Sequence, residues 1–129
     1  MITHAEEVIE ESDLKIFKSI KEKLSKIDKF PIKTELLTCH MLAHAVAEVY
    51  DLKVVDGFWR SGYNHSWIET DYLNVIDVYP VGMVGGPVLL DHIVTGGQFY
   101  YTPDNFELIG DVSSTEFRES VEIIKKCLT

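Results

Sequence analysis

Apolar residues recur along this chain at two periods, and the change of period separates helical from extended segments. Within residues 5–29, 39–50 and 113–129, apolar side chains lie three or four positions apart, as on one face of a helix. These stripes comprise Leu14, Phe17, Ile20, Leu24 and Ile27; Leu42, Ala45, Val46 and Val49; and Phe117, Val121, Ile124 and Leu128. We predict N-terminal helices in two pieces, a helix over 39–50 and a C-terminal helix.

Polar and proline residues predict where these helices begin and end. Ser12 is suited to cap the second N-terminal piece, and Pro31 would stop it. Ser113 with Glu116 has the spacing of a capping box for the last helix. The connection 30–38 then leads directly into the helix that begins at Cys39.

Segments rich in Val, Ile, Phe, Trp and Tyr predict strands between the central and C-terminal helices. They cover residues 53–60, 65–70, 74–79 and 98–102, with a short apolar stretch, 88–90, inside a glycine-rich region. Short connections between strands require antiparallel pairing. The predicted fold class is therefore α+β, a single domain over residues 1–129 in which helices pack on one antiparallel sheet.

The strands over 65–70 and 74–79 predict a hairpin that brings two polar side chains together. With a three-residue loop at 70–72, His65 lies directly opposite Asp77, and Trp67 lies opposite Val75. Directly opposed residues have Cβ atoms roughly 4.5–5.5 Å apart, which is close enough for an imidazole to meet a carboxylate. A slip of one residue would place the two side chains on opposite faces.

Cys39, His65 and Asp77 occur in the order and setting of a thiol nucleophile, its base and an orienting carboxylate. A cysteine at a helix N-terminus gains stabilisation of its thiolate from the helix dipole and free N–H groups. The Cys39 N–H can contribute to an oxyanion site, completed by a side chain from residues 34–38 or by Asn64. These alternatives stay open.

The same residues resemble the transglutaminase-like superfamily of papain-fold cysteine enzymes. The likeness covers residues 36–80: a Cys at a helix start, then His65-Ser66-Trp67-Ile68-Glu69, then Ile76-Asp77-Val78-Tyr79-Pro80. It implies a papain-like core with Cys39 as nucleophile, His65 as base, Asp77 as orienter and Trp67 packed beside the site. Leu37-Thr38 replaces a glycine-containing turn, and the domain is minimal. We therefore expect hydrolysis of a peptide or small amide, as by a peptidase, amidase or deamidase, in preference to cross-linking.

Charge and composition limit the classes of partner that we expect this protein to bind. The formal net charge is −9. From residue 31 onward the chain has 14 acidic and six basic side chains, and this acidic excess argues against binding nucleic acid. The lysines of residues 12–30 are interpreted as a solvated helix face. Without an apolar run long enough for a bilayer or a signal-peptide pattern, we expect a cytoplasmic protein with no membrane partner. Two cysteines in such a chain do not predict a structural disulfide.

Two other functions fit parts of the pattern. His40 and His44 are four residues apart on one helix face, with Glu48 a turn further, and this spacing can hold zinc. Met41 stands where the HExxH motif has its glutamate, so we rank zinc below the thiol enzyme and expect neither metal nor cofactor. The third hypothesis is a catalytically inactive binding module of the same fold. Substrate and oligomeric state are left open.

Overall fold

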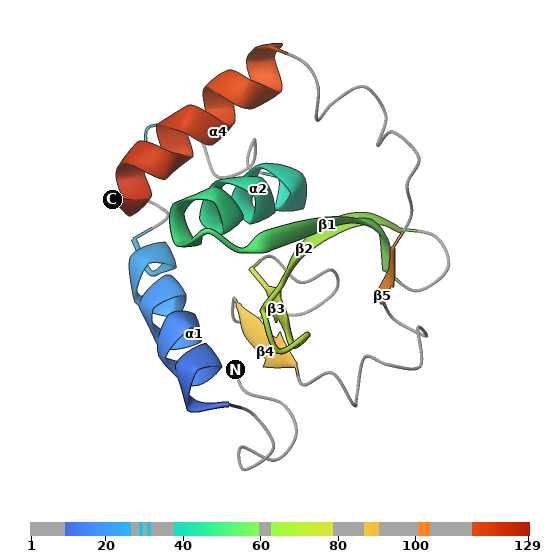
Figure 1. Ribbon diagram of the computed structural model, residues 1–129. Coiled ribbons are helices and arrows are strands. Elements are labelled where there is room, and N and C mark those ends of the chain that lie inside the picture. The colour runs from blue at the N-terminus through green and yellow to red at the C-terminus, as the bar shows by residue number, and fades with distance from the viewer. Residues whose placement is uncertain are drawn as a thin grey trace.

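The computed structural model describes residues 10–26, 29, 31, 38–59, 63–78, 87–90, 101–103 and 115–129. This part of the chain forms the helices α1 (Glu11–Leu24), α2 (Cys39–Tyr50) and α4 (Thr115–Leu128), and the strands β1 (Lys53–Trp59), β2 (Tyr63–Glu69), β3 (Val75–Asp77), β4 (Val88–Leu90) and β5 (Tyr101–Pro103). The strands form one sheet in the order β4-β3-β2-β1-β5, with antiparallel neighbours. The chain is therefore an α+β protein, as its hydrophobic pattern predicts (Figure 1).

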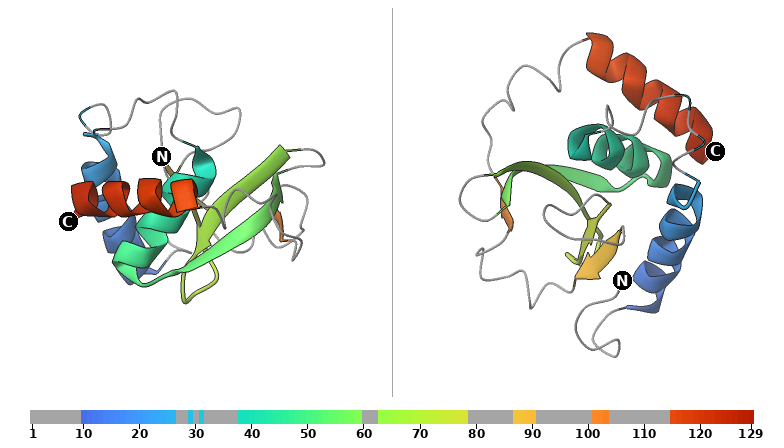
Figure 2. Two further views of the ribbon diagram at one scale, coloured as in Figure 1. Left: turned by 90° about the horizontal axis from the view of Figure 1, so that it is seen from above. Right: turned by 180° about the vertical axis from the view of Figure 1, so that it is seen from behind.

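The three helices gather on one side of the sheet, with α2 between α1 and α4 (Figures 1 and 2). The apolar stripes predicted from the sequence supply the core between them. Its buried members include Phe17 and Ile20 of α1, Leu42 and Val46 of α2, and Ile124 of α4. Val49 is only partly buried against this core, and Ile27 lies outside the described residues. Helical periodicity thus located the buried faces of all three helices.

The helix boundaries differ in part from those predicted. Helix α1 begins at Glu11, so Ser12 lies inside it; Glu10 occupies the N-cap position and makes no side-chain capping bond. The prediction that Ser12 caps the helix is therefore wrong. Ser113, half of the predicted capping box, lies outside the described residues, as do residues 98–100 of the last predicted strand.

The two faces of the sheet have different surroundings, because side chains alternate along each strand. Ile68 of β2 and Ile76 of β3 belong to the core that the helices cover. Trp67 and Val75 pack instead with Val55 of β1 in a smaller apolar cluster. Odd-numbered residues of β2 therefore point away from the helix-covered core.

The hairpin between β2 and β3 has a register two residues away from the one predicted. Ile68 pairs with Ile76 and Glu69 with Val75, and the loop is formed by Asp71, Tyr72 and Leu73. The Thr70 carbonyl accepts from the Leu73 N–H, and Leu73 adopts a positive φ of 67°. A turn closed by a left-handed residue is a common three-residue hairpin, although glycine usually fills that position. The predicted direct opposition of His65 and Asp77 is wrong, but a shift of two keeps both on one face.

Helix α1 is joined to this hairpin by buried polar contacts. Asp13 Oδ2 accepts hydrogen bonds from Thr70 Oγ1 at 2.5 Å and from Asn74 Nδ2 at 2.8 Å. Asn74 Nδ2 also donates to Glu10 Oε1 at 2.8 Å. Because buried carboxylates need such donors, these contacts fix the start of α1 against the turn that positions β3.

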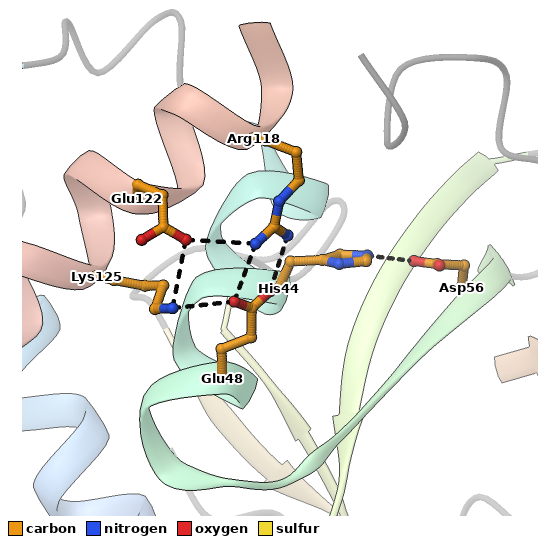
Figure 3. Close-up of polar contacts among 6 residues, drawn as sticks. All are labelled: His44, Glu48, Asp56, Arg118, Glu122 and Lys125. Carbon is orange, nitrogen blue, oxygen red and sulfur yellow. Dashed lines mark hydrogen bonds and ion pairs between the residues drawn. The ribbon is translucent and has the colours of Figure 1, made fainter. Parts of the chain in front are cut away.

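Charged side chains connect α4 to α2 at the surface (Figure 3). Arg118 donates to both carboxylate oxygens of Glu48, at 2.9 and 3.1 Å, and Lys125 Nζ lies 3.1 Å from Glu48 Oε1. Glu122 contacts both cations. Exposed ion pairs contribute little individually, so the apolar faces supply most of the attachment of α4. No helix among the described residues is long and apolar enough to cross a membrane.

Candidate active site

Cys39 is the first residue of α2, as predicted. Thr38 occupies the N-cap position with an extended backbone, and its hydroxyl accepts a hydrogen bond from the Met41 N–H at 3.2 Å. This cap leaves the thiol in the first helical turn, where N–H groups lack intrahelical acceptors and the helix dipole favours negative charge. The sequence therefore places a thiol where its anionic form is stabilised.

His65 and Asp77 form a buried pair on adjacent strands. His65 Nε2 lies 2.8 Å from Asp77 Oδ2, and both side chains are 0% exposed. In the observed register, Asp77 is a diagonal neighbour of His65, which imidazole and carboxylate can bridge. Since a carboxylate only accepts, Nε2 carries the proton in this bond. Nδ1 is then the ring nitrogen that can exchange a proton with a nucleophile.

Cys39 and His65 interact strongly enough to change each other's ionisation. Burial acts to raise the pKa of Cys39, but hydrogen bonds with His40 and His65, and their charge, outweigh it and lower that pKa from 9.0 to about 6. Burial acts to lower the pKa of His65, but hydrogen bonds with Asp77 and Cys39 outweigh it and raise that pKa from 6.5 to about 9. Between these values the pair is a thiolate and an imidazolium.

Trp67 and Asn64, the predicted substrate-binding residues, occupy different environments. Trp67 is 2% exposed, and its ring centroid lies 6.1 Å from that of His65. Its buried indole therefore lies beside the imidazole and provides an apolar surface there. Asn64 is exposed near the start of β2. The alternative oxyanion donors at 34–37 lie outside the described residues, so the structure does not choose between them and Asn64.

Gly57 of β1 pairs with His65 across the ladder. Because glycine has no side chain, the imidazole has no bulky neighbour at that position of β1. Glycine inside a strand often marks a place where another group approaches the backbone closely.

A second group of polar side chains joins α2 to the sheet, and sequence reasoning did not foresee it. His40 Nδ1 lies 2.6 Å from Ser66 Oγ, Ser66 Oγ donates to Asp56 Oδ1 at 2.5 Å, and His44 Nε2 lies 3.0 Å from the same oxygen. Figure 3 shows His44 directed from α2 toward Asp56 on β1. The signal that could have found this group is the pairing of Asp56 with Ser66 in adjacent predicted strands.

These contacts also bear on the zinc hypothesis. His40 and His44 use ring nitrogens to contact Ser66 and Asp56 respectively. Across the described ranges, no three His, Cys, Asp or Glu side chains are grouped closely enough to hold a metal ion. The donor set around these two histidines therefore fits a hydrogen-bonded network, in which the hydroxyl of Ser66 links one imidazole to a carboxylate.

Comparison of the chain with protein-family models, curated proteins and solved structures found no significant match. The central features of this site are a thiol at a helix N-terminus and a buried imidazole–carboxylate pair whose imidazole helps to lower the pKa of that thiol.

Proposed function

We propose that this protein is a cysteine-dependent hydrolase of an amide bond, built on a transglutaminase-like, papain-like core. The observation that carries the proposal is the interaction of the Cys39 thiol with His65, whose other ring nitrogen is held 2.8 Å from the buried Asp77 carboxylate. A buried histidine with a carboxylate partner and a thiol of lowered pKa is the arrangement that acyl transfer through sulfur requires.

The proposed reaction has two halves. The Cys39 thiolate attacks the amide carbonyl carbon, and the His65 imidazolium gives its proton to the leaving amine as the carbon–nitrogen bond breaks. Neutral His65 then accepts a proton from water, which attacks the thioester and releases a carboxylic acid. The sulfur leaves as the thiolate and the initial state is restored. The Cys39 N–H, in the first turn of α2, is a suitable donor to the oxyanion in both halves.

Asp77 contributes through orientation and charge. Its carboxylate fixes the proton of His65 on Nε2, so Nδ1 is the nitrogen available to the reacting atoms. It also stabilises the imidazolium, which must persist until the leaving amine is protonated. Because both side chains are fully buried, water does not compete for this hydrogen bond. A substrate therefore approaches from the side of Cys39, which is a partly exposed residue.

The test is turnover on a panel of fluorogenic peptide amides and glutamine-containing peptides, scored for released amine and for ammonia. We expect Cys39→Ala to abolish turnover and keep the circular dichroism spectrum of the parent. Cys127→Ser is the matched control, since Cys127 is the exposed second cysteine and lies on α4. Mass spectrometry of quenched reactions should find the acyl group on the Cys39 peptide. Turnover that survives in Cys39→Ala would contradict the proposal.

A further inference from the structure

One hydrogen bond joins the two residues that directly follow the proposed nucleophile and the proposed base. His40 follows Cys39 on α2, and Ser66 follows His65 on β2. His40 Nδ1 lies 2.6 Å from Ser66 Oγ. The contact therefore connects the backbone segments that carry the thiol and the imidazole.

The direction of each proton in this contact follows from the donors present. Burial acts to raise the pKa of Asp56, but hydrogen bonds from His44 and Ser66 outweigh it and lower that pKa, so Asp56 is a carboxylate at neutral pH. Ser66 has one hydroxyl proton and donates it to Asp56 Oδ1, on the directly opposed residue of β1, at 2.5 Å. The proton between His40 and Ser66 is therefore on His40 Nδ1. The same carboxylate oxygen lies 3.0 Å from His44 Nε2, which must carry a proton too.

The polar contacts of α2 add directional geometry to its apolar packing. Leu42 and Val46 hold the helix on the sheet through the core, and the hydrophobic effect is non-directional. Hydrogen bonds require particular distances and angles. Ser66 is 0% exposed, so water does not compete for its hydroxyl. The hydrogen bonds from His40 and His44 therefore fix where the first turns of α2 lie along β1 and β2.

The opposite end of α2 has a hydrogen bond of the same length to a different element. Ser19 Oγ of α1 lies 2.6 Å from the hydroxyl of Tyr50, the last residue of α2. The helix has 12 residues and is therefore about 18 Å long, so this contact is remote from Cys39. Ser19 and Ser66 thus offer a matched pair of serines, each of which bonds one end of the same helix.

We propose that the hydrogen bond between His40 and Ser66 is a positioning contact of this site, which holds the first turn of α2 beside His65. Asp56 keeps the Ser66 hydroxyl directed so that it can accept from His40. Neither His40 nor Ser66 needs to touch the reacting atoms, because each acts through the backbone of its neighbour, Cys39 or His65. The contribution to turnover rests on the proposed hydrolase function, whereas the effect on the thiol can be measured without a substrate.

The experiment measures the rate of Cys39 alkylation by iodoacetamide against pH, with peptide mass spectrometry and Cys127 as the internal standard. We expect Ser66→Ala, which loses one net hydrogen bond, to raise the Cys39 midpoint from about pH 6 to about pH 6.5–7. Ser19→Ala is the matched control and should keep the parent midpoint. His40→Asn keeps a side-chain N–H donor, so its midpoint should lie nearer to the parent than that of His40→Ala.

The decisive comparison repeats Ser66→Ala in a chain that also carries His65→Gln, whose amide can still donate to Asp77 but has no charge. If the contact acts by placing the thiol beside the imidazole, Ser66→Ala no longer moves the Cys39 midpoint in this background. It should also add nothing to His40→Ala, since both remove the same hydrogen bond. An equal rise with and without the imidazole would overturn the positioning role. If Ser66→Ala melted too low to titrate, His40→Ala with and without His65→Gln would decide in the same way.

The outcomes distinguish this inference from the proposed function. An unchanged Cys39 midpoint in Ser66→Ala and His40→Ala, with a raised one in His65→Gln, overturns the positioning role and keeps the thiol–imidazole pair. A midpoint that depends on Ser66, in a protein that hydrolyses none of the amide substrates, supports the positioning contact and counts against the proposed function. If Cys39 titrated like Cys127 in the parent, both proposals would fail.

Discussion

Two histidine–aspartate pairs lie within the described part of the chain, and they differ chiefly in their exposure to water. His65 and Asp77 are 0% exposed and 2.8 Å apart, whereas the His44 and Asp56 side chains are 14% and 26% exposed and 3.0 Å apart. In the first pair, burial acts to lower the pKa of the imidazole, but the interactions with Asp77 and Cys39 raise it to about 9. In the second, the carboxylate also accepts from Ser66. The same two residue types thus provide an imidazole that lowers the pKa of a thiol in one place and a carboxylate that accepts from a serine in the other.

Burial explains why the two pairs are not interchangeable. Removing one partner of a buried pair leaves an uncompensated polar group, while water can replace a partner at the surface. The pair proposed to perform the chemistry is therefore also the pair on which folding should depend more strongly. The partly exposed pair, His44 and Asp56, can be altered with less risk to folding. Matching substitutions in the two pairs can therefore be compared.

The largest expected effect comes from removing each carboxylate. Asp77→Ala should lower the free energy of unfolding by about 3–5 kcal/mol, because it leaves the buried His65 ring without its charged partner. Asp56→Ala should lower it less, by about 1–3 kcal/mol, since the partly exposed His44 can turn to water whereas the buried Ser66 hydroxyl loses its acceptor. Urea denaturation at pH 7 measures both. Equal losses in the two variants would show that burial does not separate the pairs.

A second prediction concerns pH. In the parent, the folded state from about pH 6.5 to 9 holds one proton on His65 and none on Cys39, while the unfolded chain holds one on the cysteine and none on the histidine. Equal proton counts make stability independent of pH in this window. Cys39→Ser removes the thiolate but keeps Asp77, so His65 remains protonated in the folded state above its unfolded pKa of 6.5.

Stability of Cys39→Ser should therefore be fully present below pH 6.5 and decline as pH rises toward the folded pKa of His65, by up to about 1.4 kcal/mol per unit. Thermal or urea unfolding from pH 6 to 9 measures the decline, and Cys127→Ser serves as the control with a flat profile. A flat profile in Cys39→Ser would mean that Asp77 does not raise the pKa of His65.

The smallest change in stability is expected in the turn of the β2–β3 hairpin, which carries His65 and Asp77. Leu73 is 58% exposed and has a φ of 67°, a conformation that costs a non-glycine residue about 1 kcal/mol. Leu73→Gly should therefore stabilise the fold by up to about 1 kcal/mol. Tyr72→Gly is the matched control, because Tyr72 lies in the same turn without a positive φ. If Tyr72→Gly stabilised the fold and Leu73→Gly did not, the proposed backbone strain at Leu73 would be contradicted.

Much of the fold follows from local patterns in the sequence. The apolar periodicity located the buried faces of α1, α2 and α4, and Cys39 begins its helix as predicted. The hairpin was placed in the correct strands but with the wrong register, because its turn uses Leu73 where glycine would have marked the left-handed position. Ser12 was assigned to a cap although the chain enters the helix one residue earlier.

The candidate site was predictable only in part. His65 and Asp77 could be paired because strand alternation determines which side chains share a face, even when the register is misjudged by two. The contacts of His44 with Asp56 and of His40 with Ser66 could not be predicted, since they depend on how far α2 lies over β1 and β2. The periodicity of a helix and of a strand does not determine the distance between them.

The placement of Asp77 also has a consequence for the accuracy of folding. Its neighbour Ile76 lies in the core that the helices cover, so a hairpin that closed one residue out of step would move the carboxylate into that apolar layer and Ile76 out of it. Such a misfolded form would bury an ionised group among hydrocarbon side chains and be strongly disfavoured. The residue proposed to orient the base would thereby discriminate against a wrongly assembled sheet during folding.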